Sequence, residues 1–106
     1  MSLRDPNRAP THPGAVLRDD VLPALAMTQT EFAERLDVSR LSVSELLHER
    51  RALSPEMAAR VAKVLRTTPD IWVRMQAARD LWELAQHPER LAKVQPVDKQ
   101  VLRRVA

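Results

Sequence analysis

The sequence predicts an all-α protein whose five helices form one domain. A chain of 106 residues is long enough for one independent core and too short for two. Apolar residues make up 44% of it and charged residues 29%, as in globular rather than disordered chains. Its aromatic residues are only Phe32, Trp72 and Trp82. Because sheets are usually rich in aromatic and β-branched side chains, this composition favours helices.

The first helix is predicted over residues 13–22. Pro13 suits the first turn of a helix, where its missing N–H needs no partner. One face of the segment carries three apolar residues, Val16, Leu17 and Val21. Pro23 is expected to end or bend this helix, because proline cannot donate to the preceding turn.

Two short helices follow within residues 28–47. Thr28 and Glu31 have the spacing of a capping box and open the first of them, which should stop near Asp37. Ser39 caps the second, whose inward side chains are Val43, Leu46 and Leu47. About three residues between two helices leave too little chain for antiparallel packing, so the pair must cross at a steep angle.

The crossing of these two helices predicts a helix-turn-helix motif. Ala33 is small where the second helix would approach, and Asp37 tolerates the left-handed conformation that the turn requires. The alternative is an ordinary helical hairpin in a small bundle. The outward face of the second helix argues against it, because short polar groups and one guanidinium suit a major groove: Arg40, Leu41, Ser42, Ser44 and Glu45.

The last two helices of the domain begin at proline. Ser54 before Pro55 is a cap followed by proline at the first helical position, and Thr68 before Pro69 repeats this signal. Pro88 closes the fifth helix. The chain beyond it is polar and basic, with a short helix possible from Asp98 to Val105.

Several motifs together carry a family resemblance. The helix-turn-helix contributes Gln29, Ala33, Val38, Ser39, Val43 and Leu46. Around it lie His12-Pro13-Gly14, Leu17-Arg18, the run from Arg51 to Ala58, the run from Thr68 to Trp72, and Asp80-Leu81-Trp82. With these motifs, residues 12–86 resemble the HigA-type antitoxins, a VapI-like branch of the lambda-repressor/Cro (XRE) helix-turn-helix family. The resemblance implies a lambda-repressor-like fold.

The chain departs from the family pattern at a few positions. The family often has glycine where this chain has Ala26 and Asp37, and an Asn-Gly pair where it has His48-Glu49. Leu41 stands where a base-reading glutamine is frequent. The operator sequence therefore cannot be transferred from the family.

The resemblance implies roles for individual residues in binding double-stranded DNA. Gln29, Arg50 and Arg51 would hold phosphates, with His48 beside them. Arg40, Leu41, Ser44 and Glu45 would face base edges, with Arg40 suited to guanine and Leu41 to a thymine methyl group. Ser39 and Ser42 would serve either the helix cap or a phosphate.

The fifth helix is predicted to form a homodimer. Its apolar surface covers more than one face, and such a helix packs against two partners, here its own domain and a second copy. The expected interface residues are Ile71, Trp72, Met75 and Trp82. The alternative is that both tryptophans belong to the core. The predicted organisation is a flexible arm at 1–12, the domain at 13–86 with its dimerising helix at 69–86, and a basic tail at 87–106.

Composition narrows the function further. A single glycine excludes glycine-rich phosphate loops, and the absence of cysteine excludes thiolate metal sites. His12, His48 and His87 lie far apart in the sequence, and no two share a helix face. We therefore expect that the protein binds no metal or cofactor and is not an enzyme. No segment predicts a membrane span or signal peptide, and we expect a cytoplasmic protein.

The resemblance implies an antitoxin that binds a HigB-type RNase toxin and represses its own operon at a palindromic operator. The alternatives are a solitary transcriptional repressor and a protein-interaction adaptor that no longer binds DNA.

Overall fold

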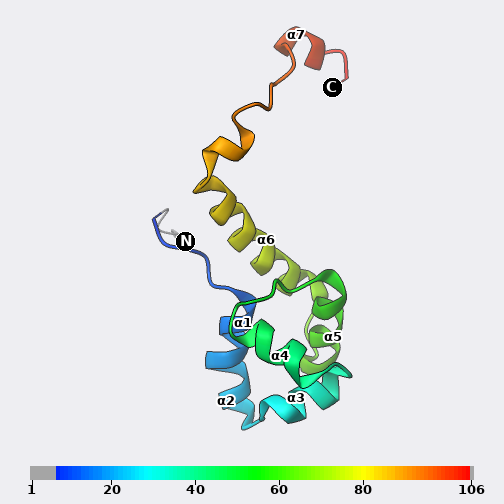
Figure 1. Ribbon diagram of the computed structural model, residues 1–106. Helices are drawn as coiled ribbons and strands as arrows, with labels where there is room; N and C mark the ends of the chain where they lie inside the picture. Colours follow the sequence, from blue (N-terminus) through cyan, green and yellow to red (C-terminus); the bar gives the residue numbers. More distant parts are fainter. Residues whose placement is uncertain (1–6, 106) are drawn as a thin grey trace.

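The computed structural model describes residues 7–105, and every regular element in that range is helical. The elements, in order, are α1 (Pro13–Val16), η1 (Leu17–Val21), α2 (Leu22–Leu25), α3 (Gln29–Leu36), α4 (Arg40–Leu47), α5 (Pro55–Leu65), α6 (Pro69–Ala85), η2 (Pro88–Leu91) and α7 (Lys99–Leu102). Figure 1 shows α1 to α5 and the start of α6 gathered into one body, from which the C-terminal half of α6 and the tail project. The all-α prediction is confirmed.

The first predicted helix does not end at Pro23. It runs on to Leu25 as one rod in which α1, η1 and α2 follow without a break (Figure 1). Its middle, η1, is a π-helical turn, and at its end the Leu22 N–H bonds to the Leu17 carbonyl five residues back. Because this wider turn changes the hydrogen-bond register, Pro23 is accommodated without ending the helix.

The two motif helices begin and turn where the sequence predicts. Thr28 Oγ1 accepts a hydrogen bond from the Glu31 N–H at 3.1 Å, and Ser39 Oγ accepts one from the Ser42 N–H at 3.1 Å. Asp37 lies between the helices with φ 57°, in the left-handed region. These caps and this turn set the crossing of α3 and α4.

The predicted starts of α5 and α6 are also correct, with one difference in capping. Ser54 Oγ accepts from the Met57 N–H and caps α5. Thr68 precedes α6 but makes no side-chain cap. Its hydroxyl instead bonds to the Asp70 carboxylate, which lowers the pKa of Asp70. The Thr68 hydroxyl therefore binds the side chain of Asp70 in the first turn of α6, and not a backbone N–H group.

The core lies where the rod, the motif helices and α5 meet. Phe32, Val43, Leu46 and Val61 are all completely buried there. Gly14 lets α1 approach α4 closely, since a Cβ on Gly14 would collide with the Leu46 carbonyl oxygen. Backbone contact of this kind fixes the position of α4 against the rod.

The predicted arm at 1–12 ends inside the fold. Residues 1–6 lie outside the described range. Pro10 and His12 are buried, so the last part of the arm packs against the domain and does not hang free. His12 Nδ1 accepts the Gly14 N–H at 2.9 Å and caps α1. Burial lowers the pKa of His12, which keeps the ring neutral and able to accept.

Among residues 7–105, four residues other than glycine adopt the left-handed conformation: Ala26, Asp37, Glu49 and Arg66. Three of these are the positions where the related family often has glycine. We expect Ala26→Gly to stabilise the domain by about 0.5–1 kcal/mol, because relief of left-handed strain exceeds the entropy cost of glycine. Urea unfolding measures this change. Ala24→Gly, in the helical part of α2, should destabilise instead, and equal effects at both positions would refute the strain argument.

Candidate nucleic-acid interface

Helix α4 separates its side chains into a buried and an outward face. Val43, Leu46 and Leu47 are buried against the domain. Outside, Arg40 is exposed, Leu41 is 68% exposed, and the serine and glutamate side chains predicted to face bases are half-buried. The predicted base-reading residues thus lie together on the surface of one helix.

Ser39 and Ser42 are occupied with each other. Besides accepting the Ser42 N–H, Ser39 Oγ donates to Ser42 Oγ at 2.9 Å. Of the two predicted roles, the geometry favours the cap for Ser39. Ser42 keeps a hydroxyl on the helix surface, half-buried.

Two arginines outside the motif hold the ends of its helices. Arg60 Nη1 donates to the carbonyls of Leu36 at 2.9 Å and Asp37 at 3.2 Å, at the end of α3. Arg18 Nη1 donates to the Leu47 carbonyl at 2.8 Å, at the end of α4. A cation at a helix C-terminus satisfies its free carbonyls and its dipole. The rod and α5 thus each contribute one arginine that binds the C-terminal end of a motif helix.

An ion-pair network positions the chain beyond α4. The Glu49 carboxylate lies 3.3 Å from Arg18 Nη1 and 3.7 Å from Arg79 Nη1. Arg79 also donates to the Pro10 carbonyl at 3.0 Å. Arg18 further pairs with Asp19, and this hydrogen bond lowers the pKa of the Asp19 carboxyl. The network ties the rod, α6 and the N-terminal segment to the loop that carries Arg50.

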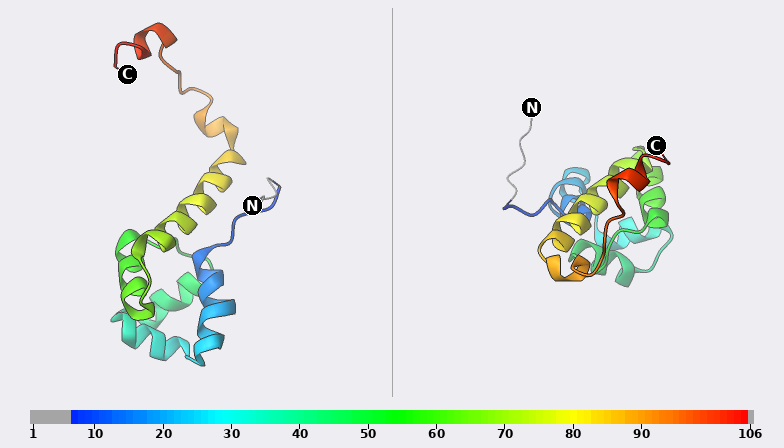
Figure 2. Two further views of the ribbon diagram at one scale, coloured as in Figure 1. Left: turned by 180° about the vertical axis from the view of Figure 1, so that it is seen from behind. Right: turned by 90° about the horizontal axis from the view of Figure 1, so that it is seen from above.

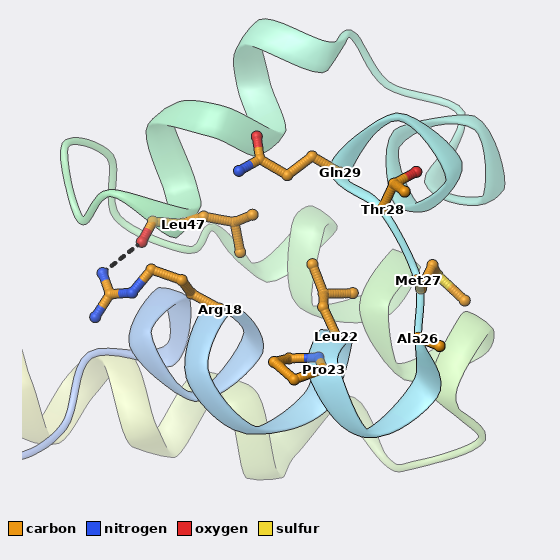
Figure 3. A pocket seen from close by; sticks show the side chains of 8 residues that line it. All are labelled: Arg18, Leu22, Pro23, Ala26, Met27, Thr28, Gln29 and Leu47. Atoms are coloured by element: carbon orange, nitrogen blue, oxygen red, sulfur yellow. Dashed lines mark hydrogen bonds between the residues drawn. The ribbon is translucent and has the colours of Figure 1, made fainter.

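Gln29 lies at the start of α3, on the wall of a pocket of about 330 Å³ between the rod and the motif. Figure 3 shows its carboxamide and the Arg18 guanidinium both near Leu47, at the junction of the rod with α4. The remaining wall is mostly apolar, from Leu22 to Met27. A helix N-terminus with an amide donor beside it suits a phosphate oxygen.

Arg50 and Arg51 are exposed after α4, as a backbone contact requires. Arg51 Nη2 lies 3.7 Å from Glu45 Oε1, so a predicted phosphate-binding residue pairs with a predicted base-reading residue. A half-exposed pair of this kind contributes at most about 1 kcal/mol. Phosphate could therefore replace Glu45 as the partner of Arg51 at little cost.

His48 turns back on its own helix. Its Nδ1 lies 2.8 Å from the Ser44 carbonyl oxygen and 3.5 Å from Ser44 Oγ. A carbonyl can only accept, so Nδ1 carries the proton and cannot take one from the serine. The His48 ring therefore caps the end of α4 by donating to the Ser44 carbonyl.

The structure corrects the predicted dimer surface at Trp72. Its side chain is only 5% exposed, and Nε1 donates to Thr67 Oγ1 at 2.8 Å. A residue so covered by its own domain offers almost no area to a second copy. Ile71 is 51% exposed, whereas Met75 and Trp82 are half-buried. Met75 packs against the core cluster of its own domain, so Ile71 and Trp82 are the two predicted interface residues that lie outside both the core and its immediate packing shell.

Within residues 7–105, no three histidine, cysteine or acidic side chains come close enough together to hold a metal ion. In the same range, no helix is both long enough and apolar enough to cross a membrane.

The family follows from the sequence comparison. A helix-turn-helix family model matches residues 20–72, which is half of the chain and contains both motif helices. YbaQ, an HTH-type transcriptional regulator of Escherichia coli (strain K12), is 41% identical over 105 residues, which cover 96% of this chain and 93% of YbaQ. The chain belongs to the helix-turn-helix family. Within it, the XRE-type resemblance inferred from the motifs is confirmed.

Antitoxins of the HigA type are among the similar proteins. Antitoxin HigA-1 of Vibrio cholerae is 31% identical and covers 86% of each chain. Pseudomonas aeruginosa antitoxin HigA, solved with the higBA promoter, has a TM-score of 0.75 at 27% identity and covers 84% of this chain and 99% of its own. Antitoxin GraA in complex with its operator has a TM-score of 0.77 at 31% identity, covering 92% and 99%. The chain is thus a HigA-like regulator of the helix-turn-helix family.

Proposed function

We propose that this chain is the antitoxin of a type II toxin–antitoxin module in the cytoplasm. It binds and neutralises a HigB-type RNase toxin, and as a dimer it represses its own operon at a palindromic operator. The observation that carries the proposal is the likeness to HigA antitoxins over almost the whole helical domain. The exposed outer face of α4 supports its DNA-binding half, because nothing in residues 7–105 covers Arg40 or Leu41.

On the operator, α4 enters the major groove with its N-terminal turn. Arg40 reads guanine, Leu41 contacts a thymine methyl group, and Ser44 offers a hydroxyl to a base edge. Glu45 accepts from cytosine once Arg51 has moved to a phosphate. Gln29 and Arg50 hold the backbone on either side, and His48 lies beside them.

The salt dependence of binding tests the phosphate contacts. For the double variant Arg50→Ala, Arg51→Ala we expect weaker binding to operator and random DNA alike. The slope of log K against log salt should flatten by about two per protomer, because each lost phosphate contact removes about 0.9 from it. Fluorescence anisotropy over a salt series gives this slope. The double variant Arg90→Ala, Arg74→Ala is the charge-matched control. A slope that stays as in wild type would mean that Arg50 and Arg51 do not contact DNA.

The proposed dimer is formed by α6. Ile71, Met75 and Trp82 follow one another along one face at helical spacing, and the C-terminal half of this helix projects beyond the body of the domain (Figures 1 and 2). A second copy packed there in two-fold symmetry would place the two recognition helices about one or more turns of DNA apart.

The antitoxin role is tested by expressing the protein that the neighbouring gene encodes, alone and together with this chain. That protein, expressed alone, should stop growth, and co-expression with this chain should restore growth and yield a complex on purification. Arg40→Ala should rescue as well as wild type while failing to repress, because the toxin surface has to lie away from the DNA face. A neighbour that is harmless alone would contradict the proposal.

A second candidate function is a solitary transcriptional repressor. It is favoured by YbaQ, which is more similar to this chain than HigA-1 is and is named as an uncharacterized HTH-type transcriptional regulator. Repression of the chain's own promoter, with no toxic neighbour, would decide for it.

A further inference from the structure

A cleft of about 740 Å³ lies where the C-terminal ends of α3 and α5 meet. Four cationic side chains line it, Arg35, Arg60, Lys63 and Arg66, and Asp37 supplies the one carboxylate. This is a strongly basic concavity outside the residues to which the sequence and the family assign DNA contacts.

Three of these cations have no partner in the fold. Arg60 is engaged with the carbonyls at the end of α3 and with Glu56. The side chains of Arg35, Lys63 and Arg66 make no hydrogen bond or ion pair with any residue of the described range 7–105. Unpaired cations of one sign around a concave surface attract an anion and raise its local concentration.

Backbone strain at Arg66 is an independent observation. Arg66 caps the end of α5 with φ 57°, a left-handed conformation in which glycine would be free of strain. The chain places a long cation there, at the rim of the cleft. This cap sets a cation at the rim of the cleft, beside Lys63 and Arg35.

The position of the cleft indicates which anion it meets. Asp37, which lines the cleft, lies in the turn between α3 and α4, three residues before Arg40, the proposed base-reading end of α4. Figures 1 and 2 place this turn at the end of the molecule away from the free end of α6. A dimer held by α6 therefore puts each cleft on the outer side of its half-site.

We propose that the cleft binds phosphate groups of the duplex that flanks the palindrome, beyond the outer end of each half-site. The contact reads no sequence. It lengthens the bound region of DNA past the base pairs that α4 recognises. The inference rests on the proposed operator binding. The rival occupant is an acidic segment of a partner protein.

Two duplexes test the proposal with the full-length chain. One holds only the palindrome footprinted upstream of the gene, and the other adds about ten random base pairs at each end, about one turn of DNA. The test variant is Arg35→Gln, Lys63→Gln, Arg66→Gly, in which the glycine also relieves strain, so that loss of folding does not confuse the result. The control variant Lys93→Gln, Lys99→Gln, Arg103→Gln removes the same charge from the tail.

Wild type and the tail control should bind the longer duplex about tenfold more tightly than the shorter one, with a steeper salt slope. The cleft variant should bind both duplexes equally, with its affinity for the short duplex within about twofold of wild type. Hydroxyl-radical footprints should lose protection only outside the palindrome.

The proposal is overturned if wild type gains nothing from the flanks, if the cleft variant keeps the gain, or if the tail control loses it. A cleft variant that binds both duplexes like wild type but no longer rescues growth would assign the cleft to a protein partner instead. Failure of wild type to bind either duplex would overturn the proposed operator binding itself, a result distinct from loss of the flank effect alone.

Discussion

Gly14→Ala is expected to destabilise the domain by about 2–4 kcal/mol, because the added methyl group collides with a backbone atom. The atom is the Leu46 carbonyl oxygen of α4, and a carbonyl in a helix cannot turn aside as a flexible side chain can. Relief requires the rod to move away from the recognition helix, which opens the core around Leu17 and Leu46, both completely buried. Urea unfolding followed by circular dichroism measures the change, with an unchanged slope m.

The neighbouring position provides the control for this prediction. Ala15→Gly removes a methyl group one residue away and should cost only the helix propensity of glycine, about 0.5–1 kcal/mol. If Gly14→Ala costs no more than this, α1 and α4 are not in backbone contact.

Trp82→Arg is expected to convert a dimer into a monomer and to weaken operator binding by more than about 100-fold, because two linked half-sites then bind independently. Trp82 is half-buried and lies outside the core cluster, which ends at Trp72. The variant should therefore fold, with a circular dichroism spectrum like that of wild type. Sedimentation velocity measures the oligomeric state.

Val73→Arg is the matched control for the dimer. It adds the same charge to α6 nine residues earlier, on the opposite side of the helix. It should leave both the dimer and operator binding in place. A monomeric wild type, or a dimer that survives Trp82→Arg, would contradict the proposed role of α6.

Local chemistry made much of the fold predictable from sequence. Thr28, Ser39 and Ser54 each cap a helix, because a cap depends on residues three positions apart. Asp37 takes the left-handed turn for the same local reason. Such signals need no knowledge of the tertiary structure.

Contacts over long sequence separations could not be predicted in this way. Arg60 and Arg18 donate to backbone carbonyls of the motif that lie 24 and 29 residues away in the sequence. The residues next to each arginine in the sequence do not indicate which carbonyl it binds. The apolar surface of α6 predicted packing against two partners, but it did not predict that the domain itself buries Trp72 and leaves Trp82 half-buried. The burial of each tryptophan depends on how far along α6 the rest of the domain extends. The sequence did not predict the basic cleft at Arg66, because its cations lie on two helices that only the tertiary structure brings together.

The measurement that tests the account most directly is the affinity of the full-length chain for the DNA upstream of its own gene, against random duplex of equal length. At physiological salt we expect specific binding about 10³-fold or more tighter than random binding. Arg40→Ala should lose about 1–3 kcal/mol at one base pair in each half-site and accept other bases there. Equal affinity for the two duplexes, or equal losses on both with Arg40→Ala, would contradict a sequence-reading function for α4.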